Sequence, residues 1–192
     1  MLRIGTRYEN LQIDISAQTG PVDMAYFIDL FSPETYEAFT RSPRDISGFR
    51  LRHENVSKKI KPGDMFVCFS RWFGLLEVLE GPFIDEQPIF LSENDPFVVR
   101  FRVRPVVWLD IDKGIPIHDK SVWDQLSFTR DLEQGSIAWT GKVRSSLFRL
   151  DERDGAFLAD SLSTQAAEGK PYPLDDQDKR SLATPGAWCR RS

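Results

Sequence analysis

Apolar residues alternate with arginines along the segment PFVVRFRVRPVVWL at residues 96–109. Successive side chains of a strand point to opposite faces of a sheet, so this pattern predicts one apolar face and one cationic face. The apolar face consists of Val99, Phe101 and Val103, and the cationic face consists of Arg100, Arg102 and Arg104. Pro105 then predicts an interruption of the ladder, because proline cannot donate a backbone hydrogen bond. One side of this strand therefore belongs to a core.

Shorter apolar runs supply further strands. MFVCFS at 65–70 and FGLLEVLEG at 73–81 follow the turn KPGD and predict a central hairpin. Within KPGD, Gly63 permits a positive φ and the Asp64 carboxylate is expected to cap local N–H groups. A third strand at 24–31 runs into a helix whose N-cap and first residue are a Ser-Pro pair.

The remaining segments favour helices and turns. Residues 121–128 and 152–162 predict two helices packed on the sheet, with Leu158 and Leu162 one turn apart. Several strands, few helices and no alternating βαβ pattern indicate a small α+β or barrel-like β domain. The glycine-rich turns that bind dinucleotides or nucleoside triphosphates are absent from the sequence.

Length and composition restrict the class of protein. At 192 residues we expect one domain over 24–163, an N-terminal arm or edge strand over 1–23, and a tail or linker over 164–192. A net charge of −4 excludes a polycation, so contact with nucleic acid requires a local patch. The sequence shows no zinc spacing, no transmembrane run and no secretory leader, so we expect a cytoplasmic protein that has neither a cofactor nor a membrane anchor.

Two features point to nucleic acid. Segment 41–61 carries seven Lys and Arg against two acids and predicts a loop with a positive face. Trp72 falls in the hairpin turn, where a purely structural indole has little reason to lie. A base stacked on such a ring gains about 1–3 kcal/mol while nearby cations hold phosphates. The alternative is that the indole folds back over the core.

Catalytic constellations are weak in this sequence. His53 and His118 lie in polar loops without a nucleophile elbow or a zinc motif, so solvated side chains are expected. Three acidic groups offer carboxylates for a magnesium-dependent nuclease, namely Asp110 with Asp112, Asp151 with Asp154, and Asp175 with Asp176 and Asp178. They fit a turn, a helix start and a tail better, so no enzyme is predicted.

The order of four pieces is more specific than any single motif. YFIDLFSPETYEAF, KIKPGDMFVCFSRWFGLLEVLEGPFID, FVVRFRVRPVVWLD and WTGKVRSSLFRLDERDGAFLADSL together resemble the EVE domain of the PUA-like superfamily, over about residues 24–163. The resemblance implies a curved sheet or pseudobarrel with flanking helices. It also implies a pocket related to those of YTH and SRA domains, which bind a modified base in an aromatic slot. The function implied is a non-catalytic reader of a modified base, such as modified cytosine in DNA, in bacterial restriction or defence.

The resemblance assigns site residues by position. The base would lie against Phe69, Ser70, Arg71, Trp72, Phe73, Trp139 and Ser145. The contacts to the nucleic-acid backbone are expected mainly from the basic segment 41–61 and the arginine-bearing strand rather than from the resemblance. They are Arg50, Arg52, Lys58, Lys59, Arg100, Arg102 and Arg144. The expected partners are DNA or RNA carrying a modified base, and a fused or associated effector nuclease.

The alternative is a protein-interaction or tethering module with a vestigial pocket. An open cleft with aromatic walls between Trp72 and Arg144 would support the reader. An indole buried in the interior, with no cavity near it, would remove this reader proposal, which depends on a slot at Trp72.

Overall fold

A computed structural model describes residues 24–91 and 94–174. Its strands are β1 (Tyr26–Leu30), β2 (Ile46–Phe49), β3 (Met65–Phe69), β4 (Trp72–Ile84) and β5 (Val99–Trp108). Its helices are α1 (Pro33–Arg41), α2 (Glu54–Ser57), α3 (Lys120–Trp123), α4 (Thr140–Val143) and α5 (Glu152–Glu168), with short 3-10 turns η1 (Leu51–His53) and η2 (Ile111–Lys113). The expected N-terminal arm at 1–23 lies outside the described residues.

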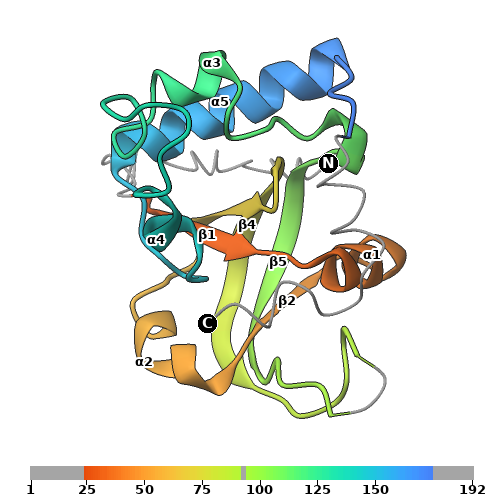
Figure 1. Ribbon diagram of the computed structural model, residues 1–192. Coiled ribbons are helices and arrows are strands. Elements are labelled where there is room, and N and C mark those ends of the chain that lie inside the picture. Colours follow the sequence, from red (N-terminus) through yellow and green to blue (C-terminus); the bar gives the residue numbers. More distant parts are fainter. Residues whose placement is uncertain (1–23, 92–93, 175–192) are drawn as a thin grey trace, which may run out of the picture.

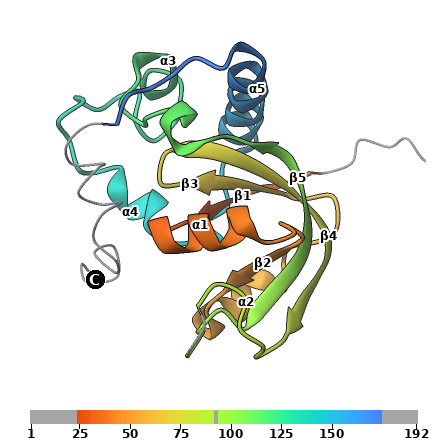
Figure 2. The ribbon, with the colours of Figure 1, turned by 90° about the vertical axis from the view of Figure 1, so that its right-hand side faces the viewer.

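The five strands form one mixed sheet in the order β1-β3-β4-β5-β2. β1 pairs with β3 in parallel, and the other neighbours are antiparallel. The long strands β4 and β5 curl the sheet into a half-barrel, with α5 and α3 at one end and α2 near the other (Figures 1 and 2). This architecture confirms the expected α+β curved sheet with flanking helices.

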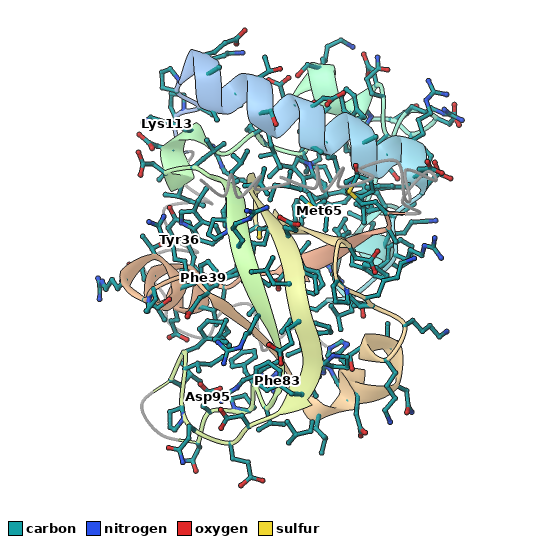
Figure 3. The ribbon with its side chains drawn as sticks, turned by 180° about the vertical axis from the view of Figure 1, so that it is seen from behind. Tyr36, Phe39, Met65, Phe83, Asp95 and Lys113 are labelled. Carbon is teal, nitrogen blue, oxygen red and sulfur yellow. The ribbon has the colours of Figure 1, made fainter. Side chains whose placement is uncertain are left out.

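Helix α1 forms where the Ser-Pro pair predicted it. The Ser32 hydroxyl accepts a hydrogen bond from the Thr35 backbone at 3.2 Å, and the Thr35 hydroxyl accepts one from the Ser32 backbone at 2.9 Å. These bonds satisfy two donors that the first turn leaves free. The helix then buries Phe39, whose ring centroid lies 4.7 Å from that of Trp108 on β5. Phe39 and the nearby Tyr36 therefore hold α1 to the sheet (Figure 3).

Helix α5 also begins as its acids predict, because the Asp151 side chain accepts from the Arg153 backbone. Leu158 and Leu162 are fully buried, as their spacing indicates. The helix continues to Glu168 and ends at Gly169, whose φ of 63° is the left-handed conformation that favours glycine. It thus runs past residue 163, where the sequence placed the end of the domain.

The basic segment differs from the expected loop. Within 41–61, residues 46–49 pair with β5 as strand β2, and residues 51–57 form η1 and α2. A strand of four residues containing a glycine has too little alternation to be recognised from sequence. The Gly63 and Asp64 predictions are confirmed: Gly63 has a φ of 92°, and the Asp64 carboxylate accepts hydrogen bonds from Ala25 and Lys61.

Candidate nucleic-acid interface

The aromatic residues at the turn between β3 and β4 lie in the protein interior. Trp72 and Phe73 are both 0% exposed, and the Trp72 ring centroid lies 4.4 Å from that of Phe69. The Trp72 backbone also exchanges two hydrogen bonds of 2.9 Å with Ile115, which comes from a distant part of the chain. The stacking role expected for Trp72 is wrong, because neither face of the indole is available to a base. The reader in the form that the sequence predicted, with its slot at Trp72, is therefore not supported at this position.

Arg71 is similarly occupied. Its side chain is buried and donates to the carbonyl oxygens of Gly114 at 3.3 Å, Tyr172 at 2.9 Å and Pro173 at 3.3 Å. The Arg71 guanidinium therefore binds residues 172 and 173, which follow α5, to the turn between β3 and β4. Ser70, in the same turn, is half-buried.

The cationic face of β5 is neutralised. Arg102 forms an ion pair with Glu80 at 3.2 Å, and Arg104 forms one with Glu77, both across the β4–β5 ladder. Arg100 does not lie on an exposed face at all: its side chain is 3% exposed and pairs with Asp85 at 3.0 Å. The prediction that Arg100 contributes to a cationic face of this strand is therefore wrong, because its side chain is buried and paired.

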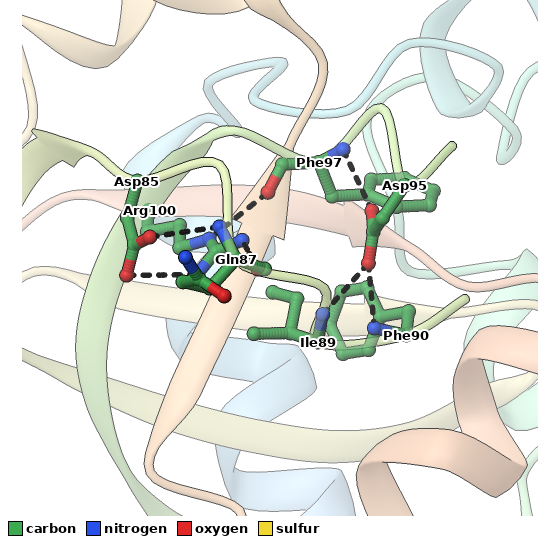
Figure 4. A network of polar contacts seen from close by, with 7 residues as sticks. All are labelled: Asp85, Gln87, Ile89, Phe90, Asp95, Phe97 and Arg100. Carbon is green, nitrogen blue, oxygen red and sulfur yellow. Dashed lines mark hydrogen bonds and ion pairs between the residues drawn. The ribbon is translucent and has the colours of Figure 1, made fainter. Parts of the chain in front are cut away.

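The loop between β4 and β5 explains the burial of Arg100. Arg100 donates to the carbonyl oxygens of Phe97 and Gln87 (Figure 4). In the same loop, the Asp95 carboxylate accepts hydrogen bonds from the backbone N–H groups of Ile89, Phe90, Leu91 and Phe97. Burial raises the pKa of Asp95, but these bonds outweigh it and the pKa is lowered below its ordinary value.

An open pocket of about 480 Å³ lies elsewhere, between α2 and the chain that precedes α5. That chain runs antiparallel beside β1, since the Leu147 N–H donates to Ile28 at 2.7 Å and the Ile28 N–H donates to Phe148 at 2.9 Å. The pocket is lined by Ala25, Phe27, His53, Val56, Lys59, Lys61, Asp64, Ser145, Ser146, Leu147, Phe148 and Arg149. It brings together one predicted base-binding residue, Ser145, and one predicted backbone-binding residue, Lys59.

The charges around this pocket are available. Lys59, Lys61 and Arg149 are exposed, and among the described residues no acidic side chain forms an ion pair with them. The buried Asp64 carboxylate already accepts two backbone N–H groups, at 2.9 Å each. The rim is therefore positive and suited to an anion.

His53 forms part of the pocket wall and is not the solvated side chain that the sequence indicated. It is 9% exposed, and its Nε2 accepts a hydrogen bond of 3.2 Å from the Arg52 guanidinium. Burial lowers the pKa of His53, and the nearby charges of Arg52 and Arg50 lower it further. The ring is neutral at pH 7 and above. Sequence reasoning missed this residue, because nothing in the local pattern distinguishes it from a loop histidine.

The other predicted residues are scattered. Lys58 is exposed but pairs with Glu54 at 2.8 Å, and it does not line the pocket. Arg144 is exposed. Arg50 lies 5.7 Å from the centroid of the Phe97 ring. Trp139 is half-buried, and its indole donates to the Ser136 carbonyl at 2.8 Å.

The acidic groups have structural partners. Asp154 accepts hydrogen bonds from the Ser127 backbone and hydroxyl, and Asp151 is the N-cap of α5. Asp110 pairs with Lys113 at 3.0 Å. Within residues 24–91 and 94–174, no cluster of three or more His, Cys, Asp or Glu side chains is arranged to hold a metal ion. The acidic group at 175–178 lies outside the described residues.

Comparison with known proteins supports the fold. No protein-family model matches the chain. A UPF0310 protein of Pyrococcus abyssi is 23% identical over 72% of this chain and 99% of its own length. A UPF0310 protein of Pyrococcus horikoshii is 24% identical over 65% of this chain and 91% of its own.

Two solved structures share the architecture. The Pho92 YTH domain in complex with m6A aligns with a TM-score of 0.51 and 16% identity, over 76% of this chain and 87% of that one. The Mmi1 YTH domain in complex with RNA aligns with a TM-score of 0.52 and 14% identity, over 77% of this chain and 83% of that one. The chain therefore has a YTH-like fold. The described residues include no helix with the length and apolar character needed to cross a membrane.

Proposed function

We propose that this protein is a non-catalytic reader of a modified base in nucleic acid, of the EVE kind. The observation that carries the proposal is the open pocket between α2 and residues 145–149, with its cationic rim. Its volume of about 480 Å³ falls in the range of roughly 300–1,000 Å³ typical of small-molecule sites. The two YTH structures support the proposal, because one is bound to m6A and the other to RNA on the same architecture.

The lining of the pocket matches the chemistry of a base. The half-buried Phe148 ring lines the pocket, with the Lys142 ammonium 5.5 Å from its centroid. Ser145, Ser146 and His53 offer hydrogen-bonding groups for a base edge. Lys59, Lys61 and Arg149 at the rim would hold phosphates. In this proposal Ser145 and Lys59 keep the roles that the sequence gave them. The hairpin residues from Phe69 to Phe73 support the fold instead.

RNA is the favoured partner, because both YTH structures contain RNA or its modified base. The resemblance at the sequence level pointed instead to modified cytosine in DNA, read in the cytoplasm beside an effector nuclease in bacterial defence. Both versions require the same pocket and differ in the sugar and the base.

A fluorescence-anisotropy titration tests the proposal. The probes are single-stranded RNA carrying m6A or 5-methylcytosine, DNA carrying 5-methylcytosine or 5-hydroxymethylcytosine, and the matched unmodified strands. We expect one modified RNA to bind at least tenfold tighter than its unmodified strand, about 1.4 kcal/mol. Equal affinity for modified and plain strands throughout would refute a base reader.

A tethering module is the second candidate. It is favoured by the hairpin turn, where the expected slot is filled by Trp72 and where Arg71 holds residues 172 and 173. Tethering predicts no measurable binding to any of these strands. It also predicts that substitutions at the pocket rim have no effect in the binding titration.

A further inference from the structure

One hydrogen-bonding group in the pocket wall has a fixed orientation. Because His53 Nε2 accepts from Arg52 Nε at 3.2 Å, the proton of the neutral ring is on Nδ1. Among the described residues no group accepts a hydrogen bond from Nδ1. His53 Nδ1 is not among the fully buried side-chain atoms that lack a partner, so this nitrogen is partly accessible to solvent. The ring is 9% exposed and lines the pocket.

We infer that His53 is a specificity-determining residue of this pocket: its Nδ1–H donates a hydrogen bond to an acceptor atom of the bound base, and Arg52 holds the ring in that tautomer. The inference rests on the proposed function and adds the atom that recognises the base edge. Arg52 is then a positioning residue, because it acts through the imidazole rather than on the base.

The surroundings keep this donor neutral. Burial is the main reason that the pKa of His53 is lowered, and the charges of Arg52 and Arg50 on the same segment lower it further. The pocket lining also includes Lys59, Lys61 and Arg149, and its one carboxylate, Asp64, accepts hydrogen bonds from backbone N–H groups. The His53 ring is therefore a neutral donor at pH 7, and the Arg52 contact selects one tautomer.

The tautomer is measured on the protein alone. A long-range ¹H–¹⁵N correlation spectrum contains the signals of two histidines, and His118→Asn assigns them. We expect His53 to show the Nδ1–H pattern from pH 7 to 8. In Arg52→Ala we expect mixed tautomers and a pKa nearer to 6.5. An Nε2–H tautomer or an imidazolium at pH 7 in the wild type would overturn the inference.

Binding separates the two ring nitrogens. An asparagine amide reaches the position of Nδ1, whereas a glutamine amide reaches that of Nε2. With RNA carrying one m6A as the probe, His53→Asn is expected to stay within about twofold of wild type. His53→Gln and His53→Ala are expected to lose about three- to tenfold, the size of one neutral hydrogen bond. Thermal melts confirm that each variant is folded.

The outcomes distinguish the two proposals. If wild type binds m6A RNA more tightly than plain RNA but all three His53 variants bind alike, the His53 inference fails and the base reader stands. If wild type binds no strand, the base reader fails, and the role given to His53 fails with it. Replacing m6A by its 1-deaza, 3-deaza and 7-deaza analogues identifies the acceptor, since one analogue should weaken wild type and leave His53→Ala unaffected. Equal effects on both proteins would contradict the contact.

Discussion

The outer face of β4 and β5 and the rim of the pocket both carry clusters of basic side chains, yet they differ in how those charges are used. On the strands, Arg102 and Arg104 pair with Glu80 and Glu77. At the pocket, the described residues provide no acidic partner for Lys59, Lys61 or Arg149. The first surface is electrostatically satisfied and the second is not, so only the second has charge to offer a phosphate backbone.

The same contrast applies to hydrophobic groups. The hairpin turn is rich in rings, but Trp72 packs on Phe69 and contributes to the core. The pocket has fewer rings, and Phe148 is only half-buried there. A binding site depends on side chains that are not fully buried or paired within the fold. The number of aromatic or basic residues in a segment does not show which side chains those are.

The largest expected effect is at the hairpin. Trp72→Ala removes a fully buried indole and should lower the free energy of unfolding by about 3–5 kcal/mol, as measured by denaturant unfolding. Trp139→Ala is the control, because that ring is half-buried and should cost less. A stability loss below about 1 kcal/mol for Trp72→Ala would contradict its place in the core.

Arg100 should behave like a core residue rather than a phosphate contact. Arg100→Ala leaves Asp85 and two loop carbonyls without their donor, and should cost about 2–3 kcal/mol of stability. Arg102→Ala, at an exposed ion pair, should change stability by less than about 1 kcal/mol. Equal stability of the two variants would remove the distinction between a buried and an exposed arginine on β5.

The interior also contains a carboxyl group, that of Asp29, whose raised pKa makes the stability of the fold depend on pH. Asp29 is buried, accepts from Ser47 at 2.6 Å, and has its pKa raised from 3.8 to about 7 by burial. The folded state then binds a proton that the unfolded state releases, so stability should fall between about pH 4 and 7 and level off above.

The slope is about 1.4 kcal/mol per pH unit, or about 2 kcal/mol between pH 5 and 6.5. Asp29→Asn should remove this slope in urea unfolding curves measured at several pH values. A wild-type stability that rises over the same interval would show that Asp29 is ionised in the folded protein.

The smallest expected effects are at the rim, and they appear in binding rather than in stability. Lys59→Ala and Arg149→Ala should each weaken RNA binding about three- to tenfold and reduce the salt slope by about one. Unfolding free energies should stay within about 0.5 kcal/mol of wild type. Lys58→Ala is the matched control, since Lys58 neighbours Lys59 but pairs with Glu54 outside the pocket. If Lys58→Ala and Lys59→Ala weaken binding equally, the cations act as general charge and the pocket does not direct them.

Much of the fold could be predicted because its signals are local. The Ser-Pro start of α1, the KPGD turn and the two faces of β5 each depend on residues within a few positions of one another. The prediction failed for Arg100, because its burial comes from a loop that folds over the strand. Pro105 was expected to interrupt the ladder, and the pairing of β4 with β5 does shift register beside it, although the strand continues to Trp108.

The site was harder to predict, since its parts meet through pairings between distant segments. Nothing near Ser145 indicates that residues 147–150 run beside β1. Trp72 was expected in a turn at the surface, but Ile115 pairs with it from more than forty positions away. Lys59 and Ser145 were both proposed as contacts from sequence, while His53, Lys61 and Arg149 became candidates only once the pocket was seen.

The pocket walls come from opposite halves of the chain, with Lys59 on one side and Arg149 on the other. The two walls form one pocket only while residues 147–150 remain hydrogen-bonded to β1. A molecule bound between the two walls would stabilise this pairing of residues 147–150 with β1. It should raise the melting temperature progressively as its concentration exceeds the dissociation constant, and it should slow amide exchange at Ile28 and Leu150.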